Sequence, residues 1–132
     1  MPALAGAYFS AGVGWLVLGI ALGIQMAASH DFLLRPVHAH ANLLGWATNA
    51  LFGCFFWLRG GVARAWEWLG FGAYNLGGAI MLGGLTALLL DKPVPPAVMP
   101  FCTTLIGAGV LQMGVAIISH SRHGRRPSTA HN

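Results

Sequence analysis

Residues 35–46 read RPVHAHANLLGW and place two histidines and an asparagine at the start of a long apolar run. Polar side chains are costly inside a membrane segment, and where they occur they usually belong to a functional site. The stretch therefore raises two questions, namely whether the apolar run crosses a membrane and what the chain gains from its histidines.

The composition indicates an integral membrane protein. Of the 132 residues 56% are hydrophobic and 8% are charged, whereas soluble domains carry about 25% charged residues. The mean hydropathy is +0.67. About 20 apolar residues span a bilayer, and four runs reach that length, at about residues 6–28, 37–58, 66–90 and 97–119. We expect an all-α fold with one four-helix transmembrane domain over residues 1–119 and a basic cytoplasmic tail over residues 120–132.

The first run is interpreted as a membrane helix and not as a signal peptide, because no Lys or Arg precedes Arg35. The basic residues predict the topology. Five of them fall on one side of the predicted helices and two on the other: Arg59, Arg64, Arg122, Arg125 and Arg126 against Arg35 and Lys92. The positive-inside rule then places both termini in the cytoplasm of a multi-pass protein in a bacterial-type inner membrane. Basic residues confined to short loops and a tail do not suggest nucleic-acid binding.

Small residues predict close helix packing. Ala73, Gly77 and Gly84 share one stripe of the third run, and such stripes let membrane helices approach one another. Cys54 and Cys102 are interpreted as small apolar residues within separate runs. The chain has no C-x-x-C-H motif, so covalent attachment of a c-type haem is not expected.

The spacing of the two histidines limits what they can bind. A regular α-helix turns about 100° per residue, so the imidazoles of His38 and His40 point about 200° apart and cannot reach one metal ion from a single helix. Two faces follow from this geometry: His38, Asn42, Gly45 and Asn49 on one, and His40, Leu44, Ala47 and Leu51 on the other.

Two interpretations of the histidines follow. They can be structural, with hydrogen bonds at the outer membrane interface. Alternatively they can bind a cofactor, because imidazole is a good axial ligand for haem iron and Gly45 would let a flat macrocycle approach the backbone. The second histidine would then serve a second cofactor or a second subunit.

The segment RPVHAHANLLGWATNALFG resembles two parts of the catalytic subunit of the haem-copper oxidases, a superfamily that includes bacterial nitric oxide reductases. Its H-x-H followed by Leu44-Gly45-Trp46 is similar to helix X of that subunit, where the first histidine binds the high-spin haem and the second the low-spin haem. Its Arg35-Pro36-Val37-His38 has the form of helix II in some members, whose histidine is the other low-spin ligand. The resemblance covers about 20 residues, a single helix.

The resemblance implies an assembly. The family subunit arranges twelve helices as three four-helix arcs. This chain is predicted to have four helices, as many as one arc. We therefore expect a homotrimer in which His38 of one chain faces His40 of its neighbour, with a non-covalent haem b between the two histidines. Arg35 would pair with a haem propionate, or else extend to the lipid headgroups. Asn42 would orient a histidine or bond two helices.

The chain also departs from the family. Its other histidines, His30, His120, His123 and His131, lie outside the apolar runs, so no copper centre is expected. Iron with two histidine ligands has no open position, which favours electron transfer or haem-based sensing over catalysis. The alternatives are an oxidoreductase related to this superfamily, acting on NO, O2, peroxide or quinol, and a non-haem subunit that is structural or binds zinc or copper. A quinone or a redox protein is the expected partner besides lipid.

Overall fold

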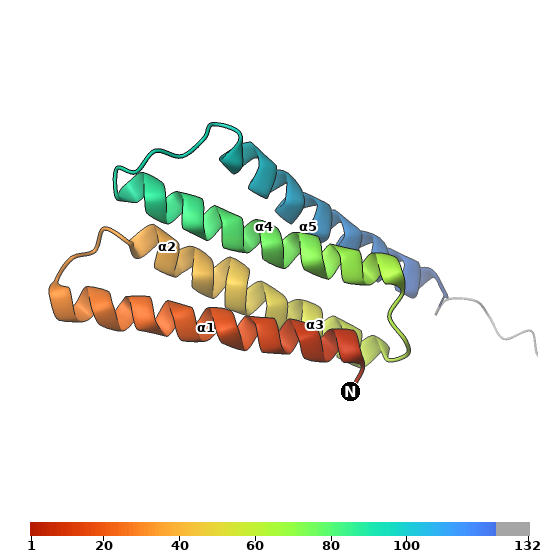
Figure 1. The fold of residues 1–132 in the computed structure, drawn as a ribbon. Coiled ribbons are helices and arrows are strands. Elements are labelled where there is room, and N and C mark those ends of the chain that lie inside the picture. Colours follow the sequence, from red (N-terminus) through yellow and green to blue (C-terminus); the bar gives the residue numbers. More distant parts are fainter. Residues whose placement is uncertain (124–132) are drawn as a thin grey trace, which may run out of the picture.

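The computed structural model describes residues 1–123, and in this part of the chain the regular secondary structure is all helix, with no strand. The predicted all-α class is thereby confirmed for the described residues. Figure 1 shows the helices side by side. They are α1 (Ala3–Ser29), α2 (Arg35–His40), the π-helix η1 (Ala41–Ala47), α3 (Thr48–Arg59), α4 (Ala65–Leu89) and α5 (Val98–His123).

Three of these helices, α1, α4 and α5, are long and apolar enough to cross a membrane, with mean hydropathies of 1.8, 1.3 and 1.9. Many of the large apolar side chains on their surfaces are exposed, such as Val13, Val17, Ile20 and Ile24 along one face of α1. Extensive exposed apolar surface is typical of a membrane or protein contact. The predicted tail from residue 120 begins inside α5, and residues 124–132 lie outside the described part of the chain.

The predicted second run is not a regular α-helix. Helices α2, η1 and α3 follow one another without a gap from residue 35 to residue 59, and the middle one is a π-helix. Each N–H of a π-helix bonds to the carbonyl five residues back instead of four, so a turn holds roughly one residue more. The assumption of 100° per residue is therefore wrong within Ala41–Ala47, and faces predicted across this segment do not hold. Leu44 packs against a buried cluster, while Leu51, predicted on the same face, is 69% exposed.

The helices pack as two hairpins. Helix α1 lies chiefly against η1 and α3, and α4 lies against α5. The predicted small-residue stripe is at the second of these contacts, because a Cβ at Gly77 would come within 2.9 Å of the Cys102 carbonyl oxygen and one at Gly84 within 2.7 Å of Met99 Cε. Two buried clusters join the hairpins, one around Tyr8 and Phe56 and one around Val37 and Leu82.

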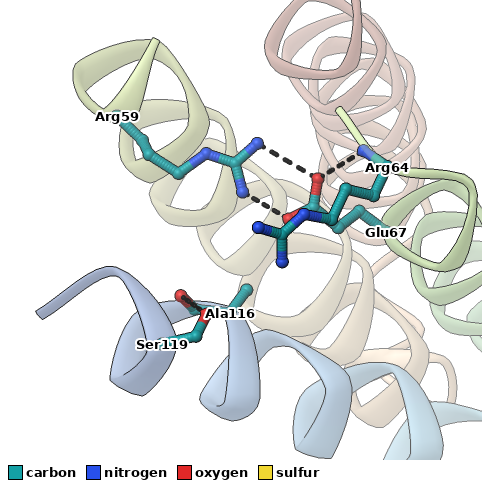
Figure 2. A network of polar contacts seen from close by, with 5 residues as sticks. All are labelled: Arg59, Arg64, Glu67, Ala116 and Ser119. Atoms are coloured by element: carbon teal, nitrogen blue, oxygen red, sulfur yellow. Dashed lines mark hydrogen bonds and ion pairs between the residues drawn. The ribbon is translucent and has the colours of Figure 1, made fainter. Parts of the chain in front are cut away.

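A buried ion pair links the two hairpins at the end of α3. Figure 2 shows the Arg59 guanidinium donating to both carboxylate oxygens of Glu67, which also accepts a hydrogen bond of 2.8 Å from the Arg64 backbone N–H. Glu67 is only 1% exposed, which is unusual for a charged residue and requires this pairing. A carboxylate in the first turn of α4 is also favoured by the helix dipole.

Replacing this carboxylate should destabilise the protein strongly. Removing one partner of a buried ion pair costs about 3–5 kcal/mol, because the other charge stays buried without compensation. We expect a loss of this order in the free energy of unfolding of Glu67→Gln, measured by denaturing-detergent titration of the purified protein in mixed micelles. The exposed Asp91 provides the control, since Asp91→Asn should change stability by less than about 0.5 kcal/mol. Equal losses in both variants would contradict a special role for the buried pair.

Candidate functional site

His38 is held against helix α1. Its Nδ1 lies 2.7 Å from the Gly19 carbonyl oxygen, and a Cβ at Gly23 would come within 3.2 Å of its Cε1. The two glycines of α1 thus let the imidazole lie against the α1 backbone. A carbonyl oxygen can only accept a hydrogen bond, so Nδ1 carries the proton and the lone pair of the neutral ring is on Nε2.

His40 has the same tautomer through a different partner. Its Nδ1 lies 2.7 Å from the Pro36 carbonyl oxygen, four residues earlier in its own helix, and the same reasoning leaves the lone pair on Nε2. Metal-ligating histidines nearly always donate their other ring N–H to a carbonyl or carboxylate, which fixes the ligating nitrogen. Both histidines therefore have the donor arrangement of a ligand, and both are half-buried.

The two imidazoles contact different parts of the chain. His38 and His40 both belong to the regular helix α2, so the separation of about 200° between them applies. In agreement with this, His38 bonds to α1 and His40 bonds back to its own helix. Among residues 1–123 no group of three or more His, Cys, Asp or Glu side chains is placed to hold a metal ion.

Asn42 supports His38. Its Nδ2 donates to the His38 carbonyl oxygen at 2.9 Å and lies 3.3 Å from His38 Nε2. Its amide also rests on Gly19, where a Cβ would come within 2.5 Å of Oδ1. Of the two predicted roles for Asn42, the structure favours orienting a histidine. Ligation through His38 Nε2 requires this amide to give up its contact with the ring nitrogen.

Gly45 was predicted to leave space for a macrocycle, but in the structure it packs against a side chain of α1. A Cβ on Gly45 would come within 2.5 Å of Trp15 Cγ, so the indole covers the glycine. The cavity beside it measures about 10 Å³, which suits one water molecule at most. The predicted approach of a macrocycle to Gly45 is therefore blocked by Trp15 within this chain.

A partly buried polar network near the histidines went unpredicted. Trp15 Nε1 donates to Asn75 Oδ1 at 3.1 Å, and Asn75 Nδ2 donates to Asn49 Oδ1 at the same distance. These three side chains link α1, α3 and α4. The available signal was Asn75 itself, because a polar side chain within an apolar run needs a partner.

The side chains around the π-helix bond to three successive carbonyls of η1. Thr48 Oγ1 donates to Leu43 O at 2.9 Å, Tyr74 Oη to Leu44 O at 2.8 Å and Asn49 Nδ2 to Gly45 O at 2.6 Å. Buried carbonyls without partners are costly. The π-helix is thus stabilised by donors from its own run and from α4.

Arg35 lies at the rim of the site. It is exposed at the start of α2, with its guanidinium carbon 5.4 Å from the centre of the Phe32 ring. In the preceding turn, the Asp31 carboxylate accepts a hydrogen bond from the Leu33 N–H at 2.9 Å, which fixes the loop. The arginine therefore has access to an anionic group outside the helices.

Comparison of the chain with protein-family models, curated proteins and solved structures finds no match.

The packing of Trp15 on Gly45 can be tested with a single methyl group. Overpacking a tight contact costs about 1–3 kcal/mol, so Gly45→Ala should lower the free energy of unfolding by this amount. Gly14 provides a matched control on α1, because a Cβ there meets nothing within 4 Å. Gly14→Ala should be neutral or slightly stabilising, as alanine favours helix more than glycine does. A neutral Gly45→Ala would show that the indole does not press on the glycine.

Proposed function

We propose that the chain is a four-helix integral membrane protein that binds haem b between neighbouring subunits of a homotrimer. His38 of one subunit and His40 of the next would be the axial ligands of a low-spin haem. The observation that carries this proposal is the shared tautomer, in which each Nδ1 is bonded to a backbone carbonyl and each Nε2 keeps its lone pair. The donor set fits haem iron, for which imidazole nitrogen is a common axial ligand.

The divergence of the rings supports an inter-subunit site. Two imidazoles about 200° apart on one helix cannot ligate one iron, whereas in a closed ring each subunit presents both of its faces to neighbours. A trimer of four-helix units is what the resemblance to haem-copper oxidases implies. The second run supplies the fourth helix of the unit, because α2, η1 and α3 continue one another over 25 residues, from residue 35 to residue 59.

The proposed orientation has both termini in the cytoplasm of a bacterial-type inner membrane. In Figure 1 the N-terminus, the α3–α4 loop and the end of α5 lie at one end of the bundle. Arg59 and Arg64 belong to this end, whereas Arg35, at the start of α2, and Lys92 belong to the other. The positive-inside rule then assigns the end with Arg59 and Arg64 to the cytoplasm, and the histidines to the outer side.

Electron transfer or haem-based sensing is the function that two histidine ligands support best. Bound haem supplies one-electron redox chemistry, and its potential depends on axial ligands and burial. In this chain Gly19 and Pro36 fix the imidazole tautomers, Asn42 positions His38, and Arg35 can pair with a propionate. A quinone or a redox protein is the proposed exchange partner.

A second candidate function, that of an oxidoreductase, is favoured by the position of Asn42. Its Nδ2 lies 3.3 Å from His38 Nε2, so it competes with iron for that lone pair. Haem held by His40 alone would have an open position for NO, O2 or peroxide, and the protein would be an oxidoreductase. Carbon monoxide separates the two candidates, because it shifts the spectrum of five-coordinate reduced haem and leaves a bis-histidine spectrum unchanged.

Mixing two variants tests the inter-subunit site directly. His38→Ala and His40→Ala should each abolish the low-spin spectrum when expressed alone. Co-expressed in equal amounts they should restore it, because a site forms wherever the intact His38 of one chain meets the intact His40 of the next. Random mixing in a ring of three gives one such site in three-quarters of the trimers, or about a quarter of the wild-type haem.

The controls exclude simple misfolding. His30→Asn removes a histidine outside the predicted ligand pair and should keep full haem content; asparagine also tolerates the positive φ of 55° at this position. No recovery in the mixture, or normal haem in either single variant, would refute the paired site. Colourless wild-type protein from haem-replete cells would refute haem binding, and a mass in detergent other than that of three chains would refute the trimer.

A further inference from the structure

A polar cavity lies at the end of the bundle opposite the histidines. It measures about 260 Å³ and opens between the α3–α4 loop and the last turns of α5. Its lining includes Arg59, Arg64, Ser119 and His120. Figure 2 shows the Arg64 guanidinium on the α5 side of Glu67, above the helix that carries Ala116 and Ser119.

The charges at this cavity are unbalanced. Arg59 and Arg64 both line it, and the nearby carboxylate of Glu67 accepts hydrogen bonds from the Arg59 guanidinium and from the Arg64 backbone N–H. One negative charge thus stands against two positive charges. The other two acids of the chain, Asp31 and Asp91, lie in the loops at the opposite end of the bundle. The cavity therefore carries a net positive charge beside the ends of apolar helices.

We propose that this cavity binds a phosphate group, supplied in the membrane by the headgroup of an anionic phospholipid. The planar fork of arginine matches the oxygens of phosphate, and basic pockets between membrane helices are typical sites for anionic headgroups. In the proposed orientation this end faces the cytoplasm, where anionic lipids are enriched. The inference does not depend on haem binding.

Arg64 is the residue on which the site depends most. The Arg59 guanidinium is already bonded to Glu67 and joins α3 to α4, so its removal would also damage the fold. Arg64 contributes to the start of α4 through its backbone N–H, which any substituted residue other than proline retains. His120 lines the same cavity and packs edge-to-face on Phe55, with ring centres 6.2 Å apart.

The test uses the full chain, purified in a neutral detergent and titrated with phosphatidylglycerol or phosphatidylcholine of identical acyl chains. Bound lipid is counted by native mass spectrometry. We expect preferential binding of the anionic lipid, and a loss of about tenfold in its apparent affinity in Arg64→Gln. Arg64→Lys keeps the charge without the fork and should give an intermediate affinity.

Lys92→Gln is the matched control, because it removes one positive charge from the opposite end of the bundle. Its affinity should stay within about twofold of the wild type, and helix content by circular dichroism should be equal in all variants. Inorganic phosphate that competes with the lipid, or binds in its place, would identify the phosphate group itself as the ligand. Equal binding of both lipids without phosphate binding, or equal losses in Arg64→Gln and Lys92→Gln, would overturn the proposal.

Discussion

The backbone of the π-helix η1 (Ala41–Ala47) is the constraint around which the centre of the bundle is organised. Three of its carbonyls accept hydrogen bonds from side chains, one of them from Tyr74 of α4. In an apolar environment no water replaces a missing donor, so the bond from Tyr74 helps to hold α4 against the helix that carries the histidines. The π-helix therefore contributes to the contact between the two hairpins, together with the two buried clusters and the ion pair of Arg59 with Glu67.

The same constraint explains the composition of α1. A helix that lies against η1 has to accommodate the amide of Asn42 and the bulk of Trp46, and both lie against glycines of α1, at Gly19 and Gly12. Trp15 reverses the arrangement, because the large residue is on α1 and the glycine, Gly45, is on η1. The indole also donates to Asn75. Steric fit and hydrogen bonding thus select the same alignment of the two helices.

The sequence predicts the helices well, because the length of a bilayer-spanning segment and the charged or proline-containing loops are both visible in it. The predicted bounds 66–90 and 97–119 lie within a few residues of Ala65–Leu89 and Val98–His123. The π-helix leaves no comparable signal, since the donors to its carbonyls include Tyr74, 30 residues from the carbonyl to which it donates. The burial of Glu67 leaves no signal for the same reason, because its partner Arg59 comes from another helix.

For the site, the sequence predicts the divergence of the histidines but not what fixes each ring. His40 bonds to Pro36 within its own helix, so its orientation follows from the local backbone alone. His38 bonds to Gly19 of α1, so its orientation depends on how α1 packs against α2 and η1. The position of the His38 ring therefore depends on helix packing, whereas the position of the His40 ring does not.

A displacement of α1 would release His38 and its neighbour Asn42, while leaving His40 in place. The polar network of Trp15, Asn75 and Asn49 opposes that displacement, because moving α1 would break the bond from Trp15 to Asn75 and leave partly buried polar groups unpaired. The polar network and His38 are therefore linked through α1 and α4. Helix α4 bonds to η1 through Tyr74 and to α1 through Asn75, and α1 in turn bonds to the ring of His38.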